Sequence, residues 1–151
     1  MNSFLIDGNN LMGKINSIKK IQNKDKESAR EKLVFLVEKY FYNKKGKIFL
    51  HFDGFENTPL KLSKGEIIYS DKSSADKNIK EQIERTKSRK NLVVISSDHE
   101  IQNFAKVCSC EVLSSEEFAK ELATSKKINE EENRIKSINN VEEFKRLFNV
   151  E

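Results

Sequence analysis

Apolar residues gather in three short runs along the chain, and an aspartate follows each run within a few residues. The runs cover residues 4–6, 48–52 and 92–95. Because nearly every position in them is apolar, they predict strands that are covered on both faces, as in a parallel sheet. Two weaker strands are expected at residues 66–69 and 110–113.

Between these runs, apolar positions recur at helical spacing, which predicts helices that each bury one face. The expected helices cover residues 28–43, 74–87, 98–106 and 115–123. Three of them begin with a serine followed three residues later by a glutamate, a capping box that starts at Ser28, Ser97 or Ser114. Strands that alternate with helices predict a three-layer α/β domain with a mainly parallel central sheet.

The C-terminal part of the chain has a different pattern. Residues 125–136 are nearly all polar. Apolar residues at helical spacing then predict a short amphipathic helix (Val141, Phe144, Leu147 and Phe148). We therefore expect a domain over residues 1–123, with a polar linker and a short C-terminal helix over residues 124–151.

Composition and charge narrow the class of protein. The 151 residues are enough for one domain with a buried core. The net charge is only +4, but residues 1–90 carry 20 basic and 12 acidic side chains, whereas residues 91–151 carry 8 and 12. The first part of the chain is therefore the better candidate for contact with a polyanion.

Targeting signals and disulfides are not expected. No apolar run approaches the roughly 18 residues of a membrane span, and the N-terminus does not have the pattern of a signal peptide. Cys108 and Cys110 are too close in sequence for an unstrained disulfide, so we expect reduced thiols packed as small apolar side chains. These features predict a cytoplasmic protein.

Aspartates mark the ends of the predicted strands. Asp7, Asp53 and Asp98 follow the three apolar runs, and Asp76 falls in the first turn of the helix expected at 74–87. Ligand sites in parallel sheets lie outside the carboxyl ends of the strands, so these acids are expected at one edge. Repulsion between neighbouring carboxylates is relieved by raised pKa values or by a bound divalent cation, and oxygen ligands favour Mg²⁺ or Mn²⁺.

Each acid also has a structural explanation. Asp7 and Asp53 precede glycines, as turn residues often do. Asp76 could complete a capping box opened by Ser73, and Asp98 would offset a helix dipole. The four acids together favour a site more than any one of them does alone. A hard cation beside basic loops suits phosphoryl chemistry.

Basic and polar residues could hold a substrate beside these acids. The lysines that follow predicted strands are expected at the same edge of the sheet (Lys14, Lys19, Lys20, Lys24, Lys26, Lys61, Lys64, Lys72 and Lys77). Those that precede strands are expected at the opposite edge (Lys44, Lys45, Lys47, Lys87, Arg89 and Lys90). The candidates for substrate contact are Asn9, Asn10, Lys14, Lys72, Lys77 and Ser97. His51 is expected in the core, and His99 is a weak candidate for a ligand or base.

Five motifs occur in an order that resembles the YacP-like branch of the NYN-domain family. They are Ile6-Asp7-Gly8-Asn9-Asn10, Ser28-Ala29-Arg30-Glu31-Lys32-Leu33, Phe52-Asp53-Gly54, Ser74-Ala75-Asp76-Lys77-Asn78-Ile79 and Val93-Val94-Ile95-Ser96-Ser97-Asp98. The resemblance covers about residues 3–122 and implies a Rossmann-like, PIN-like ribonuclease fold. It also implies an acid cluster that binds Mg²⁺ or Mn²⁺, and endonucleolytic cleavage of RNA.

Carried over by position, Asp7, Asp76 and Asp98 match the acids of the family, and Asp53 matches the acid after the second strand. The branch is associated with translation, which makes mRNA on a ribosome a candidate substrate. The main alternative is a non-catalytic RNA- or ribosome-binding module with the same fold. A receiver domain would need paired acids after the first strand, and a haloacid-dehalogenase-like phosphatase would need an aspartate where Asn9 stands.

Overall fold

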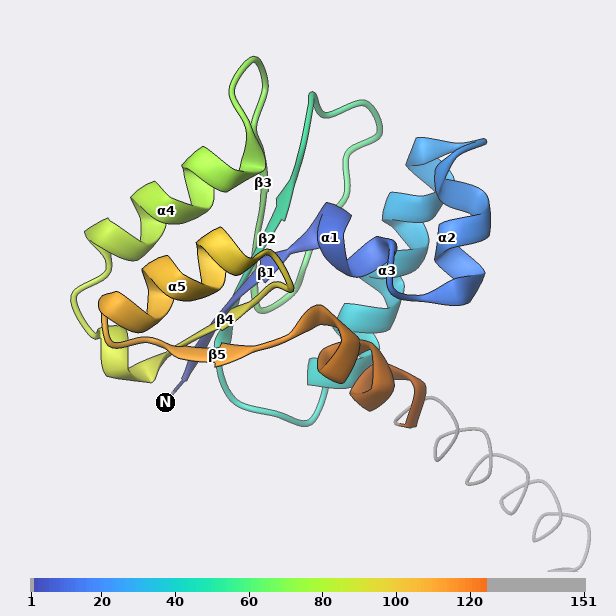
Figure 1. Cartoon of the computed structure of the whole chain (residues 1–151). Helices are drawn as coiled ribbons and strands as arrows, with labels where there is room; N and C mark the ends of the chain where they lie inside the picture. Colours follow the sequence, from blue (N-terminus) through green and yellow to red (C-terminus); the bar gives the residue numbers. More distant parts are fainter. Residues whose placement is uncertain (1, 125–151) are drawn as a thin grey trace, which may run out of the picture.

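Five parallel strands form one central sheet in the order β3-β2-β1-β4-β5 (Figure 1). The computed structural model describes residues 2–124. The strands are β1 (Ser3–Asp7), β2 (Lys47–Phe52), β3 (Gly65–Tyr69), β4 (Leu92–Ile95) and β5 (Glu111–Leu113). The predicted α/β fold with a mainly parallel sheet is confirmed, and in the described residues every strand pair is parallel.

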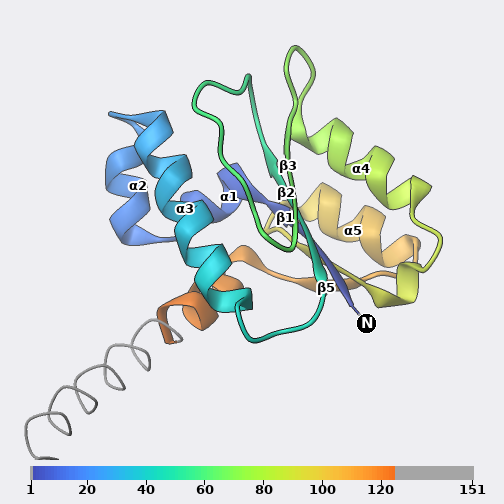
Figure 2. The same cartoon turned by 180° about the vertical axis from the view of Figure 1, so that it is seen from behind.

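Helices cover both faces of this sheet (Figures 1 and 2). On one face lie α4 (Ala75–Arg85) and α5 (His99–Val107). On the other lie α1 (Gly8–Met12), α2 (Asn16–Gln22), α3 (Lys26–Phe41) and the helix that begins at residue 115. A 3-10 turn, η1 (Arg89–Asn91), precedes β4. Helices α1 and α2 were not expected from the sequence, because their short segments carry few apolar residues.

Two apolar cores lie between the sheet and its helices. Successive strand side chains point to opposite faces, so Leu5 packs toward α4 and α5, whereas Ile6 packs toward α1 and α3. In β4, Val94 and Val93 divide between the two cores in the same way. All four of these residues are at most 6% exposed. This double burial is why the strands read as nearly unbroken apolar runs.

Three helix starts differ from the predicted ones. Helix α3 is capped by Asp25, whose Oδ1 accepts a 3.1 Å hydrogen bond from the Ser28 backbone N–H. Helix α5 is capped by Asp98 rather than Ser97. Helix α4 is capped by Ser74 rather than Ser73. In each case the capping residue has extended backbone angles and its oxygen reaches an N–H of the first turn.

The predicted capping box at Ser114 is confirmed. Its hydroxyl accepts a hydrogen bond from the Glu117 N–H, and the Glu117 carboxylate accepts one from the Ser114 N–H. Cys108 and Cys110 are free thiols, and Cys110 is buried. Among residues 2–124, no helix has the length and apolar character needed to cross a membrane. The predicted C-terminal helix lies outside the described residues.

Candidate functional site

The carboxyl edge of the sheet brings the predicted acids together. Strands β2, β1 and β4 are neighbours and run parallel, so the residues after them meet at one edge. Asp7 ends β1, Asp53 follows β2, and Asp98 caps the helix after β4. Asp76 lies in the first turn of α4, which begins at the same edge. The predicted alignment of the strand ends is thus confirmed.

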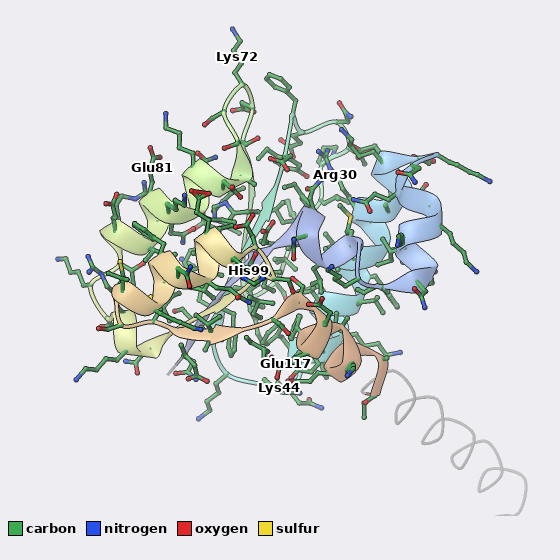
Figure 3. The ribbon with its side chains drawn as sticks, in the orientation of Figure 1. Arg30, Lys44, Lys72, Glu81, His99 and Glu117 are labelled. Carbon is green, nitrogen blue, oxygen red and sulfur yellow. The ribbon has the colours of Figure 1, made fainter. Side chains whose placement is uncertain are left out.

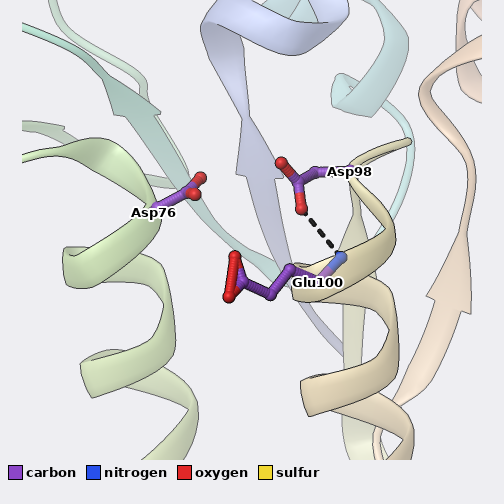
Figure 4. A group of neighbouring side chains, drawn as sticks. All are labelled: Asp76, Asp98 and Glu100. Carbon is purple, nitrogen blue, oxygen red and sulfur yellow. Dashed lines mark hydrogen bonds between the residues drawn. The ribbon is translucent and has the colours of Figure 1, made fainter.

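Three carboxylates form the tightest group at this edge. Asp76, Asp98 and Glu100 each offer a ligand oxygen, and these oxygens all lie within 4.8 Å of one another. Figure 4 shows Asp76 on α4 facing Asp98 and Glu100 on α5. Within the described part of the chain this is the group of acids best arranged to share a cation. Carboxylate oxygens are ligands that favour a hard ion such as Mg²⁺ or Mn²⁺.

Glu100 is the member of this group that the sequence analysis did not select. It stands two residues after Asp98, in the first turn of α5, where an acid is explained by the helix dipole. Its carboxylate also pairs with Lys80 of α4, with 3.4 Å between Nζ and Oε1. The only signal in the sequence was that Glu100 stands two residues after Asp98. That spacing does not reveal that α4 places Asp76 opposite these two acids.

Asp7 lies deeper than the other acids. It is only 6% exposed, and its Oδ2 accepts a 2.9 Å hydrogen bond from the Ser96 hydroxyl. Burial raises the pKa of this carboxyl to about 6, against the hydrogen bond from Ser96, which lowers it. The negative charges of Asp76 and Asp53 add to the rise. A cation at this edge would therefore compensate a carboxylate that the fold leaves poorly neutralised.

The electrostatics of Asp76 connect it to the same group. Burial raises the pKa of its carboxyl, and the charge of Asp98 is the next largest cause. Glu100 and Asp53 raise the pKa further, whereas the ammonium of Lys80 lowers it. Repulsion among these acids is the physical condition that a bound divalent cation relieves.

Asp53 is placed differently from the other three predicted acids. Its carboxylate is exposed, and Oδ1 accepts a 2.8 Å hydrogen bond from the backbone N–H of Ala75. Its own N–H donates to Asn9 Oδ1 at 3.0 Å. Asp53 therefore joins the end of β2 to the start of α4. Its negative charge also raises the pKa of Asp7 and of Asp76.

Asn9 and Asn10 connect neighbouring strand ends through their side-chain oxygens. Asn9 accepts from the segment after β2, and Asn10 accepts from the Ser97 N–H at 2.9 Å and the Ser115 hydroxyl at 2.7 Å. The Ser97 hydroxyl accepts from the Ser115 N–H and contacts the Glu116 carboxylate. These hydrogen bonds hold the strand ends together at the carboxyl edge of the sheet. A role in substrate binding stays a prediction for Asn9, Asn10 and Ser97.

The lysines divide largely as expected. Lys72 projects from the tip of the loop after β3, whereas Lys44 lies at the opposite end of the molecule (Figure 3). Lys77 is exposed in the first turn of α4, and Lys14 pairs with Glu116 at 3.5 Å. The prediction for Lys64 is wrong. Lys64 precedes β3, and its ammonium donates to the carbonyls of Phe41 and Tyr42 at the end of α3, far from the acids.

A buried arginine supports the segment after β2. Arg30 of α3 is 1% exposed, and its guanidinium donates to the carbonyls of Asp53 at 2.6 Å and Phe55 at 3.0 Å. It also pairs with Glu27 and lies over the rings of Phe52 and Tyr69. This role was not predicted from the sequence, because a single arginine on a helix is usually exposed.

His51 lies in the core as predicted, whereas a role of His99 as a ligand or base stays a prediction. His51 is 1% exposed, and its Nε2 lies 2.6 Å from Gln82 Oε1 in the core. Burial lowers the pKa of this imidazole, which keeps the ring neutral. His99 is exposed at the start of α5.

The all-parallel α/β sheet with acids at its carboxyl edge is compatible with a PIN-like fold, and the family match supports that fold. The chain belongs to the family described as YacP-like NYN domain, whose model matches residues 4–149. This match extends past residue 122, where the resemblance read from the motifs ended. The boundary predicted at residues 123 and 124 stays a prediction.

Solved structures agree with this assignment. The chain is similar to the crystal structure of Rae1 (YacP) from Bacillus subtilis, with a TM-score of 0.76 and 20% identity. That match covers 97% of this chain and 87% of the other. The W164L mutant of the same protein gives a TM-score of 0.75 at 21% identity, covering 91% and 85% of the two chains. A search among curated proteins returned no match.

Proposed function

We propose that this chain is a metal-dependent endoribonuclease that hydrolyses phosphodiester bonds of RNA. The observation that carries the proposal is the convergence of Asp76, Asp98 and Glu100 within 4.8 Å, beside the buried Asp7. Nucleases of this fold family generally depend on divalent metals, and the site here offers oxygen ligands alone. The membership of the chain in the NYN family supports RNA as the substrate.

The acids would share the metal between two helices and the sheet. Asp76, Asp98 and Glu100 would hold Mg²⁺ or Mn²⁺, with Asp7 beneath them and Asp53 acting directly or through water. When bound, the ion activates water and offsets the charge that develops on the phosphate. Ser96 keeps the Asp7 carboxylate in one orientation through its 2.9 Å hydrogen bond. Asp53 fixes the first turn of α4, and thereby Asp76, through the Ala75 N–H.

Basic and polar side chains around the acids would hold the RNA backbone. The proposed substrate contacts are Asn9, Asn10, Lys14, Lys72, Lys77 and Ser97. Lysines of this kind neutralise phosphates and make affinity fall with salt concentration. The proposed hydrolysis leaves a 5′-phosphate and a 3′-hydroxyl, and it needs no covalent enzyme intermediate. The proposed setting is the cytoplasm, with ribosome-bound mRNA as a candidate substrate.

The test is cleavage of a labelled single-stranded RNA by the full chain in Mg²⁺, Mn²⁺ or EDTA. The same RNA is also supplied as mRNA on translating ribosomes. We expect internal cuts that require the metal and yield 5′-phosphate ends. Metal-independent cutting, or no cutting of either substrate, would contradict the proposal. RNA binding without any cleavage would instead favour a non-catalytic binding module.

A further inference from the structure

Phe55 is an exposed aromatic residue at the same edge of the sheet as the acid cluster. Four large apolar side chains in residues 2–124 are strongly exposed: Phe35, Tyr42, Phe55 and Val107. Phe35 lies within α3, and Tyr42 and Val107 lie at helix ends near the amino edge of the sheet. Phe55 alone among these four follows the carboxyl end of a strand, two residues after Asp53.

The backbone that carries Phe55 is held on several sides. Arg30 binds the carbonyls of Asp53 and Phe55. Gly54 donates its N–H to the Ser70 hydroxyl at 2.9 Å and accepts from the Asp71 N–H at 2.8 Å. Gly54 has φ of +91°, which a residue with a side chain rarely adopts. These contacts fix the start of the loop while leaving residue Phe55 56% exposed.

Short chains of hydrogen-bonded residues connect the Phe55 segment to a lysine on one side and to the acid cluster on the other. Lys72 is the next residue after Asp71, which bonds directly to Gly54. The loops after β2 and β3 rise side by side above the sheet in both views (Figures 1 and 2). In the other direction, Asp53 bonds to Ala75, the neighbour of Asp76. An exposed ring, a lysine and the metal-binding acids therefore occur along one edge.

We propose that Phe55 is a base-stacking residue that positions single-stranded RNA across the acid cluster. This inference rests on the proposed ribonuclease function, since it assigns the substrate contact of the same site. Surfaces that bind single strands combine aromatic rings with basic side chains, and stacking tolerates any base. The neighbouring Glu56 would repel a phosphate, so the uncharged face of a nucleobase is the better partner for the ring. A braced backbone reduces the ordering that binding would otherwise require.

The test is the affinity of the full chain for a fluorescent single-stranded RNA in EDTA, where cleavage is prevented. Loss of one stacked base predicts that Phe55→Ala binds roughly 5- to 150-fold more weakly than wild type. Phe55→Tyr should keep the affinity. The matched control is Phe35→Ala, which removes a ring of similar exposure from α3 and should bind like wild type. Melting temperatures within about 2 °C of wild type would show that all variants fold.

Two further probes separate stacking from other effects. An RNA with abasic positions should bind wild type more weakly and should lose the difference between wild type and Phe55→Ala. The chain has no tryptophan, so Phe55→Trp introduces a single indole that a stacked base should quench. The same measurement on Phe35→Trp should give little quenching.

The outcomes distinguish this inference from the proposed function. Phe55→Ala binding as tightly as wild type, or wild type not binding single-stranded RNA, would overturn the stacking role even if cleavage occurs. Weaker binding by Phe55→Ala in a protein that never cuts RNA would support stacking and contradict the nuclease. A loss of affinity that persists on abasic RNA would also overturn the stacking role.

Discussion

The Asp53 carboxylate accepts a 2.8 Å hydrogen bond from the backbone N–H of Ala75. This bond joins the end of β2 to the first turn of α4, immediately before Asp76. The acid that follows β2 thus acts on the geometry of the metal-binding group, of which it is not a member in the structure.

Two replacements of Asp53 separate the effect of its hydrogen bond to Ala75 from the effect of its negative charge. Asp53→Asn keeps an oxygen that can accept from Ala75, so it should fold like wild type but cleave RNA more slowly if the charge matters. Asp53→Ala loses the acceptor and should lower the free energy of unfolding by about 1 kcal/mol. Urea unfolding in EDTA measures the stability, and Glu56→Ala in the same loop is the control. Equal stability of Asp53→Ala and wild type would argue against the helix-fixing role.

The raised pKa of Asp7 predicts that the stability of the protein depends on pH. Its pKa is raised from 3.8 to about 6 in the folded protein, so the folded state holds this proton more tightly than the unfolded state. Stability should therefore fall as pH rises from about 4 to about 6, and the full loss, on the order of 3 kcal/mol, should persist above that range. Asp7→Asn should remove the penalty and be more stable than wild type at pH 7.5 in EDTA.

The difference between Asp7→Asn and wild type should shrink toward pH 4, where the Asp7 carboxyl of the folded protein is protonated. Thermal unfolding across this range measures it, and Asp71→Asn controls for loss of an exposed aspartate. If Asp7→Asn were no more stable than wild type at pH 7.5, the burial of an uncompensated charge would be contradicted. The same variant should cleave RNA poorly, because it lacks the carboxylate.

Neutralising Glu100 and neutralising Lys80 should change the affinity for the metal ion in opposite directions. Glu100→Gln removes one of the three grouped carboxylates and should weaken Mn²⁺ binding by about tenfold or more. Lys80→Met removes the ammonium that pairs with Glu100 and should tighten binding about fivefold, as expected for loss of one nearby partly screened positive charge. Titration calorimetry measures both, and Lys87→Met is the control. Tighter binding by Glu100→Gln would exclude Glu100 as a ligand.

Arg30 should contribute strongly to stability. Arg30→Met would leave the carbonyls of Asp53 and Phe55 without their donor and should lower the free energy of unfolding by roughly 2–4 kcal/mol. Lys24→Met, at an exposed position before α3, should change it little. Urea unfolding compares the two. A small effect of Arg30→Met would mean that the loop after β2 is held by its other contacts.

The sequence was sufficient to predict the sheet because its central strands are buried on both faces. Residues 92–95 were predicted as a strand and form β4, and residues 4–6 lie within β1. The neighbouring order of β2, β1 and β4 then brings Asp7, Asp53 and Asp98 to one edge, as parallel strands require. This part of the site follows from the unbroken apolar runs together with the adjacent, parallel arrangement of the three strands.

The details of the site depend on how the helices pack, which a local pattern does not contain. Glu100 joins Asp76 because α4 and α5 lie side by side on the same face of the sheet. Asp98 was predicted as a metal ligand within the first turn of its helix, yet it is also the cap residue that precedes α5. Arg30 has the same sequence signature as an exposed arginine, and only the packing of α3 against the loop after β2 buries it.

The most direct test of the central claim is the single-turnover rate of RNA cleavage in Mn²⁺ for wild type and Asp98→Asn. Asparagine is as good a helix cap as aspartate, so this change removes a metal ligand and keeps the start of α5. The matched control is Glu84→Gln, an exposed acid near the far end of α4. We expect Asp98→Asn to cleave at least about 100-fold more slowly, with the control at the wild-type rate. An Asp98→Asn protein that cleaves at the wild-type rate would contradict the claim that this acid cluster holds the catalytic metal.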